Sequence, residues 1–324
     1  MTKAVRVTAF QQAELVDIPS DDTPLGPGEV TGKAITTLIS QGTELGNHYA
    51  KTKDFPYRPG YAAAWKVERV GSGVADLKPG DLVFSRGEHK LEQREKRAMI
   101  AKIPVGLSPD VATFARMMCV PMATLISTKA YPPQRVVVTG LGPVGHLAAK
   151  IFAACGYEVT GVDPQPGRRQ FLEGAGLAAL LPSIPVDEAG FAGSVAIVVE
   201  CSGHEKAVLD GCRVIRKGGE VVLVGTPWRK LTDISAWEIT NAVFFKFAVL
   251  RSGWEYELPD LATEFRPGSI MENFATALAW LASGRVKVDG LYQKVSPAEA
   301  QKAYQDLLHN RVPSLVTLFD WTKL

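Results

Sequence analysis

Residues 135–152 have the sequence RVVVTGLGPVGHLAAKIF. A run of β-branched residues leads into the pattern Gly140-x-Gly142-x-x-Gly145, and an apolar helical segment follows. In such turns the first glycine permits a tight bend, the second lets the backbone approach a pyrophosphate, and the third lets helix and strand pack closely. The helix N-terminus offers partial positive charge to the phosphates. This stretch predicts a dinucleotide-binding turn; the alternative is an ordinary glycine-rich turn of an α/β domain.

The choice of dinucleotide depends on Asp163, which closes the next apolar run 18 residues beyond Gly145. A carboxylate at the end of the second strand accepts hydrogen bonds from the ribose 2′-hydroxyl and repels a 2′-phosphate. This favours NAD(H). Arg168 and Arg169 follow closely and could meet such a phosphate, so NADP(H) stays possible.

The rest of the chain divides into two patterns. Strand-like segments at 136–139, 158–162, 195–199 and 220–224 alternate with helical segments at 143–155, 166–175 and 204–216. This succession predicts an α/β fold with a doubly wound parallel sheet and right-handed crossovers. Before it, short strands at 3–18, 29–39, 63–70 and 81–84, separated by Gly/Pro turns, predict a β-rich unit of roughly 110 residues.

The remaining segments give further predictions. A buried helix is expected over 111–129, and two more over 271–283 and 297–309. The last strand, 314–319, is expected to return to the first domain. The apolar run 242–250 is expected to form a sheet strand, whose edge is a candidate for dimer formation.

Composition narrows the class of protein. A length of 324 residues favours two domains, and the net charge of +2 gives no electrostatic case for nucleic acid or an acidic membrane surface. No window approaches 18 uninterrupted apolar residues and no signal peptide is evident, so we expect a cytoplasmic protein. The four scattered cysteines suggest neither a disulfide framework nor a zinc knuckle.

The order of these segments resembles the medium-chain dehydrogenase/reductase superfamily, whose first domain is similar to the GroES chaperonin barrel. The matching stretches are Pro27-Gly-Glu-Val, Val70-Gly-Ser-Gly, Val74-Ala-Asp-Leu-Lys-Pro-Gly-Asp-Leu-Val, Val199-Glu-Cys-Ser-Gly, Gly218-Gly-Glu-Val-Val-Leu-Val-Gly and Ala282-Ser-Gly-Arg.

The resemblance implies a GroES-like substrate domain at residues 1–120, completed by about 290–324, and a Rossmann domain at 121–289. It also implies a set of cofactor-binding residues: Gly140, Gly142, Pro143, Val144, Gly145, Asp163, Arg168, Cys201, Ser202, Gly225 and Thr226.

The chain departs from this family at the positions of the zinc ligands. Zinc-dependent members carry Gly-Ile-Cys-x-Ser/Thr-Asp, and Ile39-Ser-Gln-Gly-Thr-Glu here places Gln41 where the cysteine belongs. Their Gly-His-Glu corresponds to Gly60-Tyr61-Ala62. Cys119 is expected near the third ligand position. One thiolate with an amide and a phenol makes a poor zinc site, so no metal is expected.

Without zinc, other groups must stabilise or protonate the substrate oxygen. The candidates are the Thr43 hydroxyl, which relatives use as a proton relay, the Tyr61 phenol and the His89 imidazole, with Gln41 and Glu44 beside them. The Ser-x-Gly-Thr-Glu segment resembles dehydrogenases of bacteriochlorophyll, sugar and natural-product pathways, several of which lack the zinc ligands. Each candidate also has a structural interpretation: His89 as a satisfied loop residue and Tyr61 as a filler of the metal's place. His48 and His204 are interpreted as structural.

The resulting hypothesis is a zinc-independent oxidoreductase that moves hydride between NAD(H) and a secondary alcohol or ketone, on a sugar-like or biosynthetic intermediate. The first alternative is a quinone or enoyl reductase acting on an activated C=C bond. The second is a nucleotide-binding module without catalysis. The expected partners are a small-molecule substrate and a second copy of the chain, with no nucleic acid and no membrane.

Overall fold

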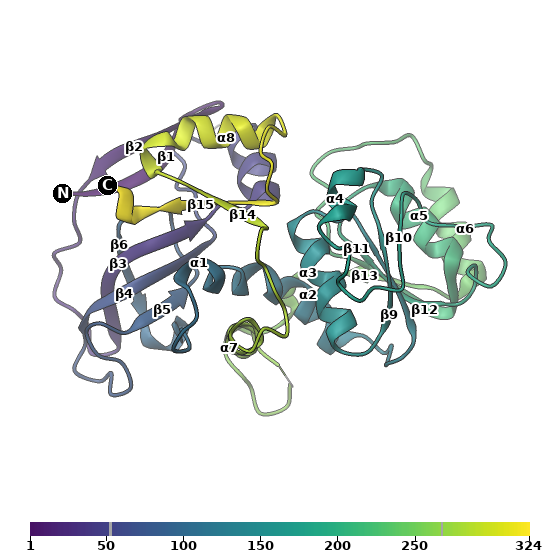
Figure 1. Ribbon diagram of the computed structural model, residues 1–324, viewed down its shortest axis with the longest axis horizontal. Coiled ribbons are helices and arrows are strands. Elements are labelled where there is room, and N and C mark those ends of the chain that lie inside the picture. Colours follow the sequence, from purple (N-terminus) through teal and green to yellow (C-terminus); the bar gives the residue numbers. More distant parts are fainter. Residues whose placement is uncertain (52–53, 267) are drawn as a thin grey trace. The chain divides into compact units, whose positions relative to one another are not determined.

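The computed structural model describes residues 1–51, 54–266 and 268–324 and divides the chain into two compact units (Figure 1). The β-rich unit comprises Met1–Arg116, Asp260–Phe265 and Phe274–Leu324. The nucleotide unit comprises Met117–Pro259 and Arg266–Asn273. The sequence placed the return to the first unit at about residue 290. In the structure it begins at Phe274, so most of α7 (Ile270–Ala282) belongs to the β-rich unit.

The nucleotide unit is built on a six-stranded sheet in the order β10-β9-β8-β11-β12-β13, in which every neighbouring pair is parallel. The strands are β8 (Arg135–Thr139), β9 (Glu158–Val162), β10 (Ala179–Leu181), β11 (Val195–Glu200), β12 (Ile215–Leu223) and β13 (Val249–Ser252). The helices are α2 (Ala115–Ser127), which starts in the β-rich unit, α3 (Pro143–Ala154), α4 (Pro166–Gln170), α5 (Glu205–Val214) and α6 (Ala236–Lys246). The predicted doubly wound parallel sheet is confirmed.

The apolar strands bury both faces of this sheet. Val136 and Val138 join a cluster with Phe152 of α3, whereas Val137 between them joins a cluster with Cys212 of α5 on the other face. Such alternation follows from the two-residue period of a strand. Helices on both faces leave the carboxyl ends of the strands as the place for a ligand.

The sequence interpretation was wrong for the run 242–250. Ser235 caps α6 and forms a capping box with Glu238, so the helix continues to Lys246. Phe247 then ends it in the left-handed conformation, with φ of 52°, and β13 follows. The capping signal outweighed the apolar composition. The helix expected over 166–175 also ends early, at Gln170, and the short strands β10 and β14 were not foreseen.

The β-rich unit contains a seven-stranded sheet and a two-stranded one. Its strands are β1 (Thr2–Ala9), β2 (Gln12–Ile18), β3 (Glu29–Leu38), β4 (Ala62–Val70), β5 (Leu82–Ser85), β6 (Glu92–Lys96), β7 (Ala101–Lys102), β14 (Tyr292–Val295) and β15 (Val316–Asp320). Its helical elements are η1 (Gln41–Tyr49), η2 (Arg97–Met99), α1 (Pro109–Ala112), η4 (Pro297–Glu299), α8 (Ala300–Leu308) and η5 (Trp321–Lys323).

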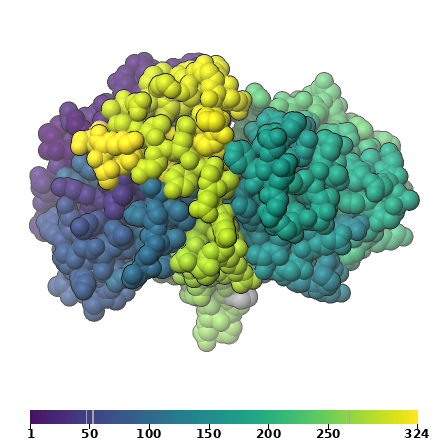
Figure 2. Space-filling view, viewed as in Figure 1, coloured from purple at the N-terminus to yellow at the C-terminus, as the bar shows by residue number. Residues whose placement is uncertain are grey.

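The end of the chain completes this unit, as the sequence predicted. β15 pairs antiparallel with β3, with Leu318 opposite Leu38. In the space-filling view the yellow C-terminal residues lie against the purple N-terminal ones (Figure 2). The core beneath them joins Val5 and Ile39 with Tyr304 and Phe319. Segments from opposite ends of the chain therefore share one core.

No helix within the described ranges has both the length and the apolar character needed to cross a membrane. The cytoplasmic location stays a prediction.

Candidate active site

The turn after β8 has the geometry expected of a pyrophosphate cradle. Gly140 has a φ of 75°, and a Cβ on it would lie 2.7 Å from Ser202. A Cβ on Gly145 would lie 1.9 Å from the Gly140 carbonyl oxygen. At Gly142, the N-cap of α3, a Cβ would meet no atom within 4 Å, so the backbone faces open space. Pro143 takes the first helical position and Val144 the next, which leaves the amides of the helix start available to an anion.

Asp163 follows β9 and is buried. Its Oδ2 accepts a hydrogen bond from the Leu141 amide and its Oδ1 accepts one from the Gln165 amide, both at 2.8 Å. Arg168 Nη1 lies 3.6 Å from Oδ2, and Arg169 donates to the Asp163 carbonyl oxygen. The structure thus joins the acidic residue directly to the glycine turn. Both arginines that could have served a 2′-phosphate are engaged with Asp163.

Two more turns pack against the glycine turn at the carboxyl ends of the strands. A Cβ on Gly225 would lie 2.4 Å from the Gly203 amide nitrogen, and a Cβ on Gly203 would lie 2.7 Å from the Thr226 carbonyl oxygen. Cys201 donates its amide hydrogen to the Thr139 carbonyl oxygen at 2.8 Å. The structure therefore brings the predicted residues Cys201, Ser202, Gly225 and Thr226 to the edge of the sheet that holds Gly140.

Glu200 lies at the centre of these turns and was not singled out by sequence reasoning. This last residue of β11 is 1% exposed. Its carboxylate accepts hydrogen bonds from the Ser202 amide at 2.7 Å, the Gly203 amide at 3.0 Å and the Thr139 hydroxyl at 3.2 Å. Burial raises the pKa of Glu200, and these hydrogen bonds oppose the rise. An acidic residue closing an otherwise apolar strand was the sequence signal for it.

In the β-rich unit, Glu44 and His89 form a buried pair. His89 is 0% exposed and Glu44 is 1% exposed. His89 Nε2 lies 3.0 Å from Glu44 Oε2, and Nδ1 lies 2.7 Å from the Thr37 hydroxyl. An ionised carboxylate only accepts hydrogen bonds, so Nε2 carries the hydrogen toward Glu44. Both imidazole nitrogens are thus engaged inside the unit.

Residues from the C-terminal return complete this buried cluster. The Tyr304 hydroxyl on α8 donates to Glu44 at 2.5 Å, and Trp321 Nε1 donates to the Thr37 hydroxyl at 2.9 Å. Burial, and then the Glu44 carboxylate, raise the pKa of Tyr304 well above its usual range, so the phenol stays a donor. We call Thr37, Glu44, His89, Tyr304 and Trp321 the buried polar network. Its members come from five separate segments.

The Ser-x-Gly-Thr-Glu segment lies on η1, a nine-residue π-helix. π-helical turns occur often at functional sites. η1 carries Gln41, Thr43 and Glu44 together; Glu44 is buried in the network, while Gln41 and Thr43 are partly exposed. Gln41 Nε2 donates to the Leu315 carbonyl oxygen at 3.3 Å. Tyr61 immediately precedes β4, and the Arg116 guanidinium lies 4.2 Å from the centre of its ring.

The other two histidines considered in the sequence have evident local contacts. His48 stacks on Tyr57 with ring centres 3.7 Å apart, and burial lowers its pKa. Burial also raises the pKa of Tyr57 to about 12. His204 caps α5 by accepting the Lys206 amide hydrogen at 3.2 Å. These contacts agree with the structural interpretation of both.

Several known proteins with a similar sequence or fold are named as dehydrogenases. Residues 143–262 match the family described as zinc-binding dehydrogenase. An L-threonine 3-dehydrogenase of Thermococcus kodakarensis is 26% identical over 280 residues, covering 72% of this chain and 77% of that protein. D-xylulose reductase A of Aspergillus oryzae is 26% identical over 291 residues, covering 76% of each. Galactitol-1-phosphate dehydrogenase from Escherichia coli has the same fold, with a TM-score of 0.82 at 18% identity over 98% of this chain and 99% of that one.

The chain is thus similar to zinc-binding dehydrogenases over residues 143–262, and to alcohol and sugar dehydrogenases over most of its length. It is an NAD(P)-dependent oxidoreductase of the alcohol dehydrogenase-like kind. The glycine turn and Asp163 remain the predicted binding site for the dinucleotide.

The residues that the resemblance assigns to the family's zinc positions are poor zinc ligands. Gln41 offers an amide that donates to a backbone carbonyl, Tyr61 offers a phenol whose ring contacts a guanidinium, and Ala62 offers no ligand. Cys119 is fully buried in α2. Catalytic zinc needs three His, Cys or carboxylate ligands. Outside the undescribed positions 52, 53 and 267, no group of three or more such side chains could hold a metal ion.

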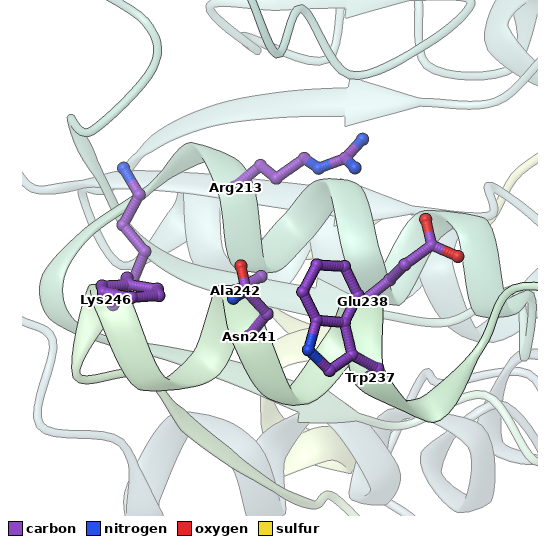
Figure 3. A pocket seen from close by; sticks show the side chains of 7 residues that line it. Arg213, Trp237, Glu238, Asn241, Ala242 and Lys246 are labelled. Carbon is purple, nitrogen blue, oxygen red and sulfur yellow. The ribbon is translucent and has the colours of Figure 1, made fainter.

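The dehydrogenase also has a hollow of about 270 Å³ on its nucleotide unit, between α5 and α6. Figure 3 shows Trp237 and Lys246 toward opposite ends of α6 with Asn241 between them, and Arg213 of α5 above. None of the predicted catalytic or cofactor-binding residues lines it. The hollow is therefore distinct from the glycine turn.

Proposed function

We propose that this dehydrogenase transfers hydride between NAD(H) and a secondary alcohol or ketone without zinc, on a sugar-like or biosynthetic intermediate. The observation that carries the proposal is the conjunction of a complete dinucleotide cradle with unsuitable donors at the zinc positions. Gly142 leaves the cradle open and Asp163 lies beside it, while the family resemblance assigns Gln41 and Tyr61 to the positions of two metal ligands. NAD(H), when bound, supplies or accepts the hydride.

Asp163 supports NAD(H) over NADP(H). Its buried negative charge stands at the end of β9, where the ribose of the cofactor is expected, and it disfavours a second negative group there. Arg168 and Arg169, the cations nearest in sequence, are turned toward Asp163 itself. We therefore expect NAD(H) to bind at least tenfold more tightly than NADP(H), which is about 1.4 kcal/mol.

In our proposal, Thr43 and Tyr61 are the groups that contact the reacting oxygen. Both carry a hydroxyl that can donate a hydrogen bond to a developing alkoxide or pass on its proton. Thr43 is partly exposed and adjoins Glu44 on η1, and Tyr61 is partly exposed before β4. Gln41 adds an amide on the same helix.

Glu44 and His89 have a different role in this proposal because they are fully enclosed. The imidazole has no exposed surface and both its nitrogens are engaged, so it acts through its neighbours as a positioning residue. The Ser40 amide also donates to Glu44 Oε1 at 2.8 Å, which fixes the start of η1. The buried polar network thereby holds the helix that presents Thr43.

The experiment uses NADH deuterated at the nicotinamide C4, metal-stripped protein and a panel of ketones, ketosugars and enones. Deuterium on a carbinol carbon, with a rate that added zinc does not raise, is the expected result. Label on the β-carbon of an enone would replace the proposal by C=C reduction. Tight NADH binding with no transfer to any substrate would favour a nucleotide-binding module.

We also propose that a second copy covers α6 and β13. β13 is the last strand of its sheet, and α6 exposes Trp237, Phe244 and Phe245 at 70%, 74% and 65%. An open strand edge beside exposed aromatic side chains is typical of an interface between copies. Sedimentation should give a dimer that Phe245→Glu dissociates. The matched control is Phe10→Glu, which alters a 59% exposed phenylalanine of the β-rich unit and should leave the dimer intact. A monomeric parent protein would contradict the proposal.

A further inference from the structure

We propose that the Glu200 carboxylate sets the preference of the nucleotide unit between the two redox forms of its cofactor, by favouring the cationic nicotinamide of NAD⁺ over the neutral ring of NADH. The inference rests on the proposed function in that it takes the bound dinucleotide to be NAD(H). It adds a role for a residue that is not among the predicted cofactor-binding residues.

Glu200 lies at the edge of the parallel sheet where ligands of such sheets bind. The strand order runs from β8 outward through β9 and β10 on one side, and through β11, β12 and β13 on the other. The order of connection therefore reverses between β8 and β11, and ligands of open α/β sheets bind outside the carboxyl ends of the strands at that reversal. Thr139 ends β8, Glu200 ends β11, and the two residues are paired in the register of these strands.

The charge of Glu200 has no cation to balance it. Its hydrogen-bond donors, the amides of Ser202 and Gly203 and the hydroxyls of Thr139 and Ser202, are all neutral. In the described parts of the chain no lysine, arginine or histidine nitrogen lies within ion-pair distance of it.

Four other buried carboxylates of this dehydrogenase differ in this respect. Glu44 is paired with His89, Asp163 lies near Arg168, Glu220 is paired with Arg251, and Asp320 is paired with Lys294.

A buried charge without a counter-ion is costly and is stabilised by any cation that arrives nearby. Burial raises the pKa of Glu200, but the four donors around it oppose this rise, because a carboxylate accepts four hydrogen bonds more readily than a neutral acid does. The inference concerns the ionised carboxylate that these donors stabilise. Of the two cofactor forms only NAD⁺ carries a positive charge on the nicotinamide. A partly screened attraction of this kind changes the ratio of the two dissociation constants by about fivefold.

The test is a pair of binding titrations, with NAD⁺ and with NADH, on metal-stripped parent protein and on Glu200→Gln. The amide has nearly the shape of the acid and removes the charge. We expect the ratio of the NAD⁺ Kd to the NADH Kd to rise about fivefold in Glu200→Gln, mainly through weaker NAD⁺ binding. Equal changes in both constants, or an unchanged ratio, would show a purely structural role and overturn the inference.

Two further variants keep the result interpretable if Glu200→Gln folds poorly. Glu200→Asp keeps the charge and should keep the ratio of the parent protein, even where both constants rise. Thr139→Val removes a neutral donor to the carboxylate and should also leave the ratio unchanged; a shift as large as that of a charge-removing variant would contradict the inference.

The titrations also separate this inference from the proposed function. A parent protein that binds both cofactor forms but reduces no ketone would overturn the proposed reaction and leave the Glu200 result valid. A parent protein that binds neither form would overturn both.

Discussion

The β-rich unit and the nucleotide unit each enclose one histidine completely, and the two histidines differ in their hydrogen bonding. His89 has both ring nitrogens in hydrogen bonds, with Glu44 and Thr37. His146, at the start of α3, has no hydrogen-bond partner for either nitrogen among the described residues. Equal burial therefore does not mean equal function. The first imidazole is part of a polar network, whereas the second packs as a neutral, nearly apolar ring.

The strongest test of this difference exchanges each histidine for leucine. His89→Leu leaves the buried Glu44 carboxylate without its imidazole partner and should lower the free energy of unfolding by about 4 kcal/mol. His146→Leu removes two unsatisfied nitrogens from an apolar site, so the free energy of unfolding should stay the same or rise by about 1 kcal/mol. Urea unfolding at pH 8 measures both. Similar losses in the two variants would contradict the distinction.

The pH dependence of stability should reveal His146 separately. Burial lowers the pKa of His146 to about 3, from an ordinary value of 6.5 in the unfolded chain. Between these two values the unfolded chain binds a proton that the native protein does not bind. His146 therefore does not lower the free energy of unfolding above pH 6.5. As the pH falls from 6.5 toward 3, His146 lowers this free energy by on the order of 1 kcal/mol per pH unit. The difference between the parent protein and His146→Leu, measured from pH 8 to pH 5, isolates this contribution; parallel curves would exclude it.

Two tyrosines allow a comparison between a hydrogen bond to a carboxylate and a hydrogen bond to a backbone carbonyl. Tyr304 donates to the Glu44 carboxylate, while Tyr157 donates to the Ala130 carbonyl oxygen at 2.9 Å. Tyr304→Phe should cost about 2 kcal/mol of unfolding free energy and Tyr157→Phe about 1 kcal/mol. Chemical denaturation of the two variants side by side provides the measurement. A cost for Tyr157→Phe equal to or above that of Tyr304→Phe would argue against a difference between the two acceptors.

The smallest effect on stability is expected at Thr43, although its effect on turnover should be large. The partly exposed side chain of Thr43 lies outside the buried polar network, so Thr43→Val should change the unfolding free energy by less than about 0.5 kcal/mol. If its hydroxyl relays the proton, kcat should fall by about 100-fold. Thr43→Ser retains the hydroxyl and should retain most of kcat. Equal activity of the valine and serine variants would remove Thr43 from the mechanism.

The nucleotide unit could be predicted in detail because its signals are local. A strand, three glycines and a helix lie within residues 135–152, and Asp163 follows at a fixed spacing. The failures there were also local: the capping box of Ser235 and Glu238 outweighed an apolar run that had been interpreted as a strand. Glu200 was overlooked because its importance depends on turns that follow three different strands.

The site in the β-rich unit could be predicted only in part. Thr43, Glu44 and His89 were named from the segment around them, but Thr37, Tyr304 and Trp321 were not. Tyr304 is 260 positions from Glu44, and Trp321 is 284 positions from Thr37. No periodicity or short motif records a contact over such a separation. The burial of His89, and hence its proposed positioning role, follows only once these residues are in place.

The pairing of β15 with β3 has a consequence for the order in which the protein forms during synthesis. The first strands to leave the ribosome include β3, but its partner β15 and the Tyr304 phenol are translated more than 250 residues later. The nucleotide unit between them has its six strands by Ser252. We therefore expect the nucleotide unit to fold first. The β-rich unit cannot complete its sheet and core until β15 and α8 have been synthesised.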